Sequence, residues 1–373
     1  MKGILIILLF LTIKSFGQDK EVVFKSIEDA LLKPTEVKSL DLSDTKIKEL
    51  PIDILKFTNL DKIDLGSNPD INLIQAFELL KKIKTLKTIW ITDCKLKTIP
   101  SNISELKGLE EIWLDDNELT ELPEPIKKLE NLQYLRLFSN EIKNVSFDNN
   151  DLPNLTYIDL CYNKFETFPV ELSKLKNLKR IIIWYNSIKI IPSSINQFKK
   201  IEEINLEQNE ISSLPKEFGE LSTLKKLSLR KNKLKTKALK PVWTLTNLAD
   251  LELESNDISK LPKTIKNLKN LKRLSIGKNP IKLLPNELSE LGELEQLGLV
   301  EIPQLQWTEA FEIMSKIQNL KRVGMPSNKF VIMPNGFEKL KQVELFWLNH
   351  NNFSQVERER IKQMLPNSKI EFT

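Results

Sequence analysis

The sequence feature that most constrains the fold is a repeat of about 23 residues that runs through most of the chain. Its frame is L-x-x-L-x-L-x-x-N-x-L, often followed by x-x-L-P, and the stretch LEEIWLDDNELTELP at 109–123 shows it in full. The ninth position of the frame falls at Thr45, Asn68, Cys94, Asn117, Asn140, Asn163, Asn186, Asn209, Asn232, Asn256, Asn279, Ile302, Asn328 and Asn351. Ten of these thirteen intervals are 23 residues, one is 24 and two are 26. A fixed period in this range predicts a solenoid, in which each repeat packs on its neighbours.

The alternation of apolar and variable residues within each repeat predicts a short strand. In the repeat quoted above, Ile112 and Leu114 fall on one face of the strand, and Trp113 and Asp115 fall on the other. Equivalent strands one repeat apart can pair in parallel and bury their Ile and Leu side chains in a continuous core. The other face is then left open to solvent or to a partner.

Asparagine fills eleven of the fourteen ninth positions, where the chain turns away from the strand. An Asn side chain can bond backbone groups of its own turn and of the neighbouring repeat. We therefore expect the asparagines to form a ladder of hydrogen bonds. The prolines of the L-P dipeptides fall where the chain turns to the outer side, so the sheet loses no donor.

This repeat resembles the leucine-rich repeat family in its 23-residue L-P subtype, and in particular its secreted bacterial members. The resemblance covers roughly residues 37–353. It implies an α/β solenoid: a horseshoe of about 14 repeats with a parallel concave β-sheet and short helical caps at both ends. It also implies protein–protein interaction, although a fold alone does not name a partner.

Two repeats, at 69–88 and 303–322, are longer than the others and share the sequence A-F-E. Their apolar residues recur at helical spacing, which predicts a helix on the outer side of each. We interpret their likeness as duplication rather than as a sign of function.

The ends of the chain predict a signal peptide at 1–17, an N-terminal helical cap at 18–36 and a C-terminal cap at 354–373, around a repeat domain at 37–353. Residues 1–17 carry a Lys near the start, an apolar run and small residues before an expected cleavage between Gly17 and Gln18. The apolar run is shorter than the roughly 20 residues that a membrane span needs, and we expect no transmembrane segment. The mature protein is expected to be secreted, periplasmic or on the cell surface.

Helices are predicted in both caps. FKSIEDALLKP should begin a helix at Ser26, whose side chain can cap it. In the C-terminal cap, Val356, Ile361, Met364 and Leu365 are expected on a helix, followed by a short strand that ends at Phe372.

Of the two cysteines, Cys94 occupies a ladder position, and Cys161 is expected on the open face three repeats later. At about 4.8 Å per strand they lie about 14 Å apart, whereas a disulfide needs Cα atoms within about 7 Å. We predict no disulfide.

The charge balance argues against one class of partner. The chain has 56 Lys and Arg against 51 Asp and Glu, a net charge of +5. This balance is too even to imply nucleic-acid binding, so no nucleic-acid partner is expected.

The sequence has no recognisable enzyme motif. It contains one histidine, His350, and none of the glycine-rich phosphate-binding motifs. The carboxylates of Asp115 and Asp116 are interpreted as an exposed, solvated or partner-binding pair rather than as an acid–base pair. We therefore predict no catalytic activity, no cofactor and no metal.

Aromatic residues gather at the open-face positions of the third to seventh repeats. The candidate partner-binding residues are Trp90, Trp113, Asp115, Tyr134, Arg136, Phe138, Tyr157, Asp159, Tyr162, Trp184 and Tyr185. Arg136 should lie against Trp113 and pair with Asp159. If each ring exposes about a third of its surface, the patch reaches on the order of 500 Å², the size of a binding site. The alternative is that the rings only stack across strands.

The later repeats differ, because the residues at the second and third positions alternate in sign. They are Lys179-Arg180, Glu202-Glu203, Lys225-Lys226, Ala249-Asp250, Lys272-Arg273, Glu295-Gln296 and Lys321-Arg322. We expect a self-neutralising ladder whose exposed pairs contribute about 1 kcal/mol or less each. A second contact zone at Glu207, Arg230, Glu252 and Glu254 is the alternative.

The favoured hypothesis is a secreted, non-enzymatic binding module that holds a protein or peptide on its aromatic concave face. One alternative is glycan binding or adhesion, since aromatic rings beside carboxylates also suit sugars. Another applies if residues 1–17 are not a signal peptide: the protein would then resemble cytoplasmic scaffolds of the Ras-associated repeat group.

Overall fold

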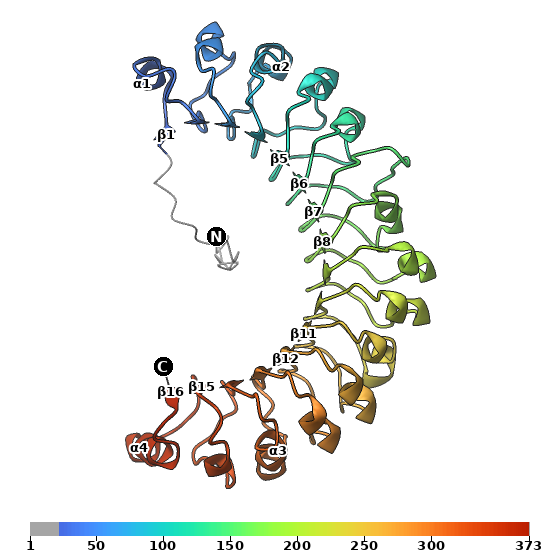
Figure 1. Cartoon of the computed structure of the whole chain (residues 1–373), viewed down its shortest axis with the longest axis vertical. Helices are drawn as coiled ribbons and strands as arrows, with labels where there is room; N and C mark the ends of the chain where they lie inside the picture. Colours follow the sequence, from blue (N-terminus) through green and yellow to red (C-terminus); the bar gives the residue numbers. More distant parts are fainter. Residues whose placement is uncertain (1–21, 373) are drawn as a thin grey trace.

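The computed structural model describes residues 22–372, so the signal peptide predicted at 1–17 lies outside the described residues. The chain winds into an open arc of stacked turns (Figure 1). One parallel sheet of sixteen strands lines the inside of the arc, and the strands pair in chain order from the first to the last. The predicted horseshoe solenoid is confirmed.

The strands are short, mostly of three residues. They are β1 (Val23–Phe24), β2 (Ser39–Asp41), β3 (Lys62–Asp64), β4 (Thr88–Trp90), β5 (Glu111–Trp113), β6 (Tyr134–Arg136), β7 (Tyr157–Asp159), β8 (Arg180–Ile182), β9 (Glu203–Asn205), β10 (Lys226–Ser228), β11 (Asp250–Glu252), β12 (Arg273–Ser275), β13 (Gln296–Gly298), β14 (Arg322–Gly324), β15 (Leu345–Trp347) and β16 (Lys369–Glu371). The fourteen predicted repeats supply β2 to β15. β1 is not among the predicted elements; it pairs Val23 with Ser39 and extends the sheet by one strand at its N-terminal end.

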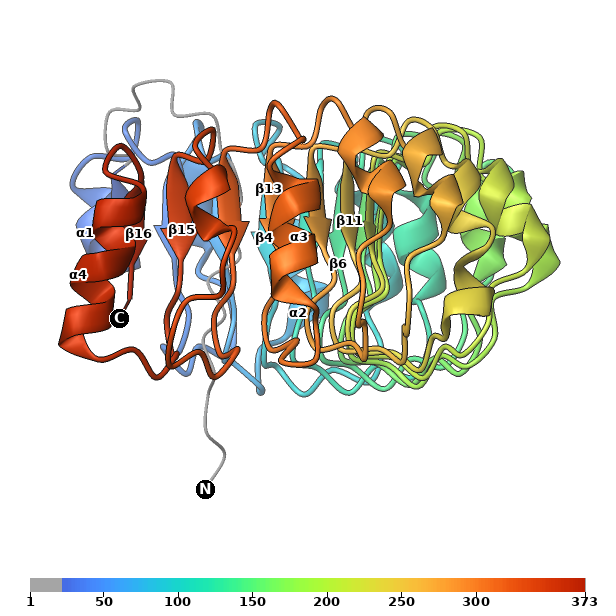
Figure 2. The same cartoon turned by 90° about the horizontal axis from the view of Figure 1, so that it is seen from below.

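The outer side of the arc carries helices, most of them single 3₁₀ turns labelled η. They are α1 (Ile27–Leu31), η1 (Ile52–Lys56), α2 (Leu73–Leu80), η2 (Ser101–Glu105), η3 (Glu124–Lys128), η4 (Val170–Lys174), η5 (Ser193–Gln197), η6 (Lys216–Glu220), η7 (Thr236–Leu239), η8 (Val242–Thr244), η9 (Lys263–Asn267), η10 (Asn286–Glu290), α3 (Trp307–Met314), η11 (Phe337–Lys339) and α4 (Gln355–Met364). Seen from below, these helices form a layer outside the strands (Figure 2). The two longer repeats hold α2 and α3, as predicted.

The core lies between the two layers and runs through the whole arc. Ile112 and Leu114 are fully buried, and Ile112 lies in register between Ile89 and Leu135 on the adjacent strands. Each repeat adds Leu, Ile and Phe side chains to this one cluster. Burial of such a side chain contributes about 1.5–3 kcal/mol, so stability is roughly the sum of contacts between neighbouring repeats.

The asparagine ladder is confirmed. Asn117 donates from Nδ2 to the carbonyls of Leu114 (3.0 Å) and Ile91 (2.8 Å), and its Oδ1 accepts from the amide of Leu96 (3.0 Å). Asn140 repeats the pattern one turn later, with Nδ2 2.9 Å from the Leu114 carbonyl. The side chain therefore satisfies buried backbone groups of two successive repeats.

Both ends contain the predicted helices. The Ser26 side chain accepts from the Asp29 amide (3.1 Å) at the start of α1. At the other end, Ile361 of α4 is fully buried and β16 pairs with β15. Val356 also lies on α4, as predicted, and 81% of this residue is exposed. It lies five residues before Ile361, which places it about 140° around the helix from the buried side.

Candidate functional site

The predicted aromatic residues lie on and just beyond β4 to β8, and the structure divides them into three groups. The first, which we call the tryptophan stack, consists of Lys62, Trp90, Trp113 and Arg136. The indoles of Trp90 and Trp113 are parallel to within 18°, with centroids 4.3 Å apart. Lys62 Nζ lies 3.7 Å from the Trp90 ring, and the Arg136 guanidinium lies 4.2 Å from the Trp113 ring.

The strand register explains this stack. Trp90 is the register partner of Trp113, and Trp113 that of Arg136. Lys62 of β3 is paired with Thr88 and reaches the Trp90 ring diagonally from the adjacent strand. The predicted contact of Arg136 with Trp113 is confirmed. Because each indole has both faces covered, this group fits the cross-strand stacking interpretation.

The second group is the tyrosine pair, Tyr134 and Tyr157, whose rings lie 5.9 Å apart. Arg180 lies 4.7 Å from the Tyr157 ring on the opposite side from Tyr134's strand. The Tyr157 hydroxyl donates to Asp159 Oδ2 at 3.4 Å. Burial, reinforced by the nearby Asp159 carboxylate, raises the pKa of Tyr157, so this phenol stays neutral.

The third group, which we call the aromatic cluster, consists of Phe138, Tyr162, Trp184 and Tyr185. Tyr162 stacks on Tyr185 (4.1 Å, 14°), meets Trp184 edge-on (4.8 Å) and lies 5.0 Å from Phe138. Tyr162 and Tyr185 expose 36% and 43% of their surface. These two rings therefore present an apolar surface to the inside of the arc.

Both tyrosines of the cluster have an unusual backbone conformation. Tyr162 has φ of 52° and Tyr185 has φ of 56°, in the left-handed region that bulky residues rarely adopt. The equivalent eighth position is left-handed in every repeat, and the other repeats fill it with polar residues. These are Asp44, Ser67, Asp93, Asp116, Ser139, Gln208, Lys231, Ser255, Lys278, Glu301, Ser327 and His350. A strained conformation of this kind is a reason to look for a functional role.

Arg136 is shared by two carboxylates. Its guanidinium lies 2.7 Å from Asp115 Oδ2 and 4.0 Å from Asp159 Oδ2, so the predicted pair with Asp159 exists but is the longer one. Asp115 is only 5% exposed, and its Oδ1 accepts from the Phe138 amide (3.1 Å). The expectation of an exposed Asp115–Asp116 pair is therefore wrong for Asp115, because that side chain lies beneath Arg136. Asp116 is exposed.

Burial raises the pKa of Asp115 to about 7, against the opposing effect of Arg136 and with a further contribution from Asp159. The Arg136 guanidinium thus pairs with two buried carboxylates, those of Asp115 and Asp159. This centre is the most perturbed acid of the aromatic region.

Two residues of the open face prove to be covered. Cys161 was expected on that face, yet it is fully buried, and burial raises the pKa of its thiol well above the usual value. Phe138 and Trp184, at the equivalent positions of the repeats on either side, have ring centroids 6.1 Å apart. Ile182 is also buried. Cys161 and Cys94 are both free thiols, as predicted.

Lys62 and Arg180 are the residues that the sequence prediction missed. Each covers a predicted aromatic ring from the adjacent strand. The register supplies the signal, because Lys62 and Arg180 occupy the open-face positions next to the predicted aromatic strands.

The charge ladder of the later repeats is confirmed. Glu202 lies between Lys179 (3.7 Å) and Lys225 (2.8 Å), and Lys272 lies 3.9 Å from Glu295. In the suggested second contact zone, Arg230 pairs with Glu254 (2.9 Å).

The remaining acids of that zone are also occupied. Glu207 pairs with Lys231 (3.0 Å), and Glu252 accepts from the Ser228 hydroxyl (2.9 Å). The carboxylates of this zone are thus engaged within the protein.

Between residues 22 and 372, no group of three or more His, Cys, Asp or Glu side chains is arranged to hold a metal ion. No helix in the same range is long and apolar enough to cross a membrane.

Two models of repeat sequences match the chain. One, described as leucine rich repeat, matches residues 176–234 and 199–258; the other, described as two copies of leucine rich repeats, matches residues 130–173. No curated protein matches the sequence.

Solved structures extend the similarity to nearly the whole chain. A leucine-rich repeat protein of Leptospira interrogans is 29% identical, with a TM-score of 0.72, over 94% of this chain and 100% of that one. An internalin of Listeria monocytogenes is 20% identical (TM-score 0.61; 92% of each chain). TLR13, in a complex with ssRNA13, is 21% identical (TM-score 0.69; 92% of this chain and 55% of that one). The last two share the fold alone.

The repeat frame, the single curved parallel sheet and these matches define a leucine-rich repeat solenoid. The chain belongs to the leucine-rich repeat family.

Proposed function

We propose that this protein is a binding module without enzymatic activity, which holds a protein or peptide partner on its concave face at the aromatic cluster. The observation that carries the proposal is the pair Tyr162 and Tyr185, two exposed, stacked rings in left-handed positions. Leucine-rich repeat solenoids are commonly protein–protein interaction modules, and nothing in the matches points to catalysis.

Stacking within the protein accounts for the tryptophan stack but not for the aromatic cluster. Trp90 and Trp113 are enclosed between two cations, which gives each ring a partner inside the fold. Tyr162 and Tyr185 instead combine backbone strain with exposed apolar surface. Exposed aromatic anchors of this kind dominate the energetics of protein interfaces.

The geometry favours a protein or peptide over a glycan. A sugar ring lies flat on a free aromatic face, whereas Tyr162 and Tyr185 cover one face of each other. The edges and hydroxyl groups of these rings are better suited to the side chains and backbone of a polypeptide.

The local charge disfavours RNA at this position, although TLR13 shares the fold and is known in a complex with ssRNA. Asp115 and Asp159 share the single guanidinium of Arg136, and Asp116 adds a further exposed carboxylate. Phosphate binding depends on an excess of cations. In this region the cations do not outnumber the acids, and Lys62 and Arg180 already lie against aromatic rings.

The test has two stages. The mature protein is used to recover partners from envelope extract and culture medium, and the dissociation constant of each recovered protein is then measured with purified components. A Tyr162→Ala/Trp184→Ala/Tyr185→Ala variant should weaken binding by at least about 100-fold, since each anchor contributes roughly 1–2 kcal/mol or more.

Trp347→Ala is the matched control, because Trp347 stands on the same sheet in β15, far from the aromatic cluster. It should leave the dissociation constant unchanged. Equal affinity of the triple variant and the wild type, with circular dichroism unchanged, would rule out the aromatic cluster as the binding site. A glycan or RNA oligomer that bound through the same three residues would change the class of ligand.

We further propose that the protein is exported and cleaved between Gly17 and Gln18. The proposal is supported by the layout of residues 1–17. Intact-mass measurement of the protein from its native host should find a chain that begins at Gln18. A chain that retains Met1 would favour the cytoplasmic scaffold instead.

A further inference from the structure

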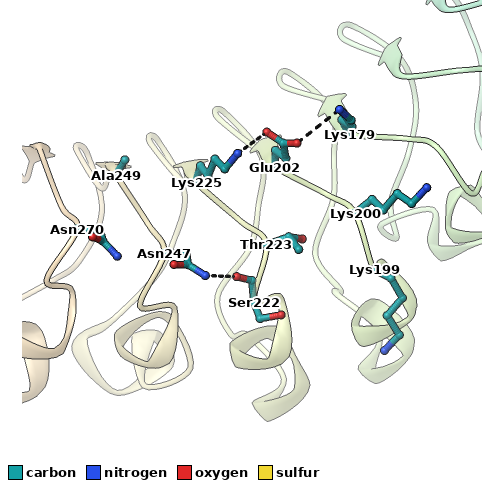
Figure 3. A pocket seen from close by; sticks show the side chains of 10 residues that line it. All are labelled: Lys179, Lys199, Lys200, Glu202, Ser222, Thr223, Lys225, Asn247, Ala249 and Asn270. Atoms are coloured by element: carbon teal, nitrogen blue, oxygen red, sulfur yellow. Dashed lines mark hydrogen bonds and ion pairs between the residues drawn. The ribbon is translucent and has the colours of Figure 1, made fainter.

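A row of alternating charges runs along one flank of the sheet, at the residue just before each strand. On β8 to β10 the row contains Lys179, Glu202 and Lys225, which Figure 3 shows side by side with Glu202 between the two lysines. It resumes before β12 and β13 with Lys272 and Glu295. In this row an interior carboxylate such as Glu202 pairs with the lysines on both sides.

The alternation is interrupted at Ala249. The pattern requires an acid between Lys225 and Lys272, yet the side chain there is a methyl group (Figure 3). Within residues 22–372, Lys225 therefore forms an ion pair only with Glu202, and Lys272 only with Glu295. The row lacks one carboxylate at a position with a lysine on each side.

The gap opens onto a pocket of ≈ 590 Å³ between the row and the outer helices. Its lining includes Lys199 and Lys200, whose amines bond the Asn196 carbonyl (2.8 Å) and Asn177 Oδ1 (2.8 Å) rather than any carboxylate. The ionisable lining residues are Lys179, Lys199, Lys200, Lys225 and Glu202. Four positive charges against one negative give the pocket a formal charge of +3.

We propose that this flank, from β8 to β12, is a second interaction surface that binds an acidic segment of a protein partner. One partner carboxylate occupies the gap at Ala249, between Lys225 and Lys272, and neighbouring carboxylates face Lys199 and Lys200. The partner thereby supplies the acid that the row lacks. This surface is separate from the aromatic cluster and does not depend on the function proposed for it.

The lining favours carboxylates over the phosphates of a nucleic acid. Sites for single-stranded nucleic acids combine cations with aromatic rings on which bases stack. None of the residues that line this pocket is aromatic, and Glu202 lies among its lysines. Carboxylates are already the groups that alternate with lysine along the row.

The experiment measures fluorescence anisotropy of three labelled probes at low ionic strength: octaglutamate, octaglutamine and octauridylate. Octaglutamate should bind and octaglutamine should not. Ala249→Glu completes the row from within, so it should weaken octaglutamate binding by about fivefold or more. Ala249→Gln adds similar bulk without charge and should leave affinity within about twofold.

Ser101→Glu is the control for net charge, because it adds the same charge on the outer side of a distant repeat. It should change affinity by less than Ala249→Glu does. The proposal is overturned if octaglutamate fails to bind, if the two glutamate variants have equal effects, or if octauridylate binds more tightly and responds more strongly to Ala249→Glu. Circular dichroism of each variant confirms that the fold is kept.

Discussion

The repeats around β5 to β8 and those around β9 to β12 share one backbone and one core but present different surfaces. In the first region, aromatic rings and a buried acid pair cover the sheet; in the second, ion pairs between successive strands do. The charged region pairs most of its carboxylates with cations of adjacent strands and lacks one acid at Ala249, whereas the aromatic region leaves strained tyrosines exposed. The comparison teaches that an identical frame can carry two surfaces that are incomplete in different ways, one short of a charge and the other with uncovered apolar rings.

The largest effect on stability is expected from substitutions in the core. It should be the same in the two regions, because their cores are alike. Leu135 and Leu251 are both fully buried at the centre of their strands. Leu135→Ala and Leu251→Ala should each lower the free energy of unfolding by about 2–5 kcal/mol. Urea denaturation measures both. A cost of less than about 1 kcal/mol for either variant would contradict the shared core.

The pH dependence of stability should differ between the regions. The pKa of Asp115 is raised to about 7 in the folded protein, whereas an unfolded Asp titrates near 4. The folded state therefore binds the proton more tightly, and stability falls as pH rises from about 4 through about 7. The part due to Asp115 is about 2–4 kcal/mol.

Asp115→Asn should remove this part of the pH dependence. The free energies of unfolding measured by urea denaturation at pH 5 and pH 8 should then differ less in the variant than in the wild type. Glu252→Gln is the counterpart in the charged region. Burial raises the pKa of Glu252 as well, and the Ser228 hydroxyl opposes the shift. An Asp115→Asn protein with the wild-type pH profile would show that this carboxylate is charged throughout.

Replacing a strained tyrosine should have a smaller effect on stability than replacing a core leucine, and an effect of opposite sign. Tyr185→Asn places at the left-handed position a residue that adopts it more easily. Stability should stay equal or rise by about 0.5–1 kcal/mol, while partner affinity falls. Gln208→Asn, at the equivalent left-handed position beside β9, should give a similar gain in stability and leave partner affinity unchanged. A destabilisation of 1 kcal/mol or more by Tyr185→Asn would mean that the ring belongs to the structural framework.

The smallest effect on stability is expected from a substitution in the row of alternating charges. Glu202 is exposed enough that its two ion pairs are screened by water, although Lys225 lowers its pKa. Glu202→Ala should change the free energy of unfolding by about 0.5 kcal/mol or less. A loss as large as that of Leu251→Ala would show that the row stabilises the fold rather than only its register.

The fold could be predicted from the sequence because the period, the alternation and the ladder asparagines all specify the same structure. The positions of Trp113 and Arg136 followed for the same reason, since each is fixed by strand register. Burial on the open face could not be predicted this way. Asp115 and Cys161 are both buried, and burial there depends on the directions of side chains in adjacent repeats, such as Arg136, which pairs with Asp115.

The sequence also could not rank the aromatic residues. Trp113 and Tyr185 both occupy predicted open-face positions, yet one is enclosed by Arg136 and the other is exposed. The difference comes from the long cation on the next strand and from the left-handed turn. Both are properties of neighbouring residues rather than of the aromatic residue itself.

The asparagine ladder has a consequence for how the solenoid comes apart. Asn279 accepts from the Ile258 amide (3.0 Å), but the next ladder position is Ile302, which has no side-chain oxygen for the Ile281 amide. In a one-dimensional array, the weakest junction is where the array divides under force or heat. The arc should therefore split first beside β13, into a long amino-terminal segment and a short carboxy-terminal one that holds α3 and α4.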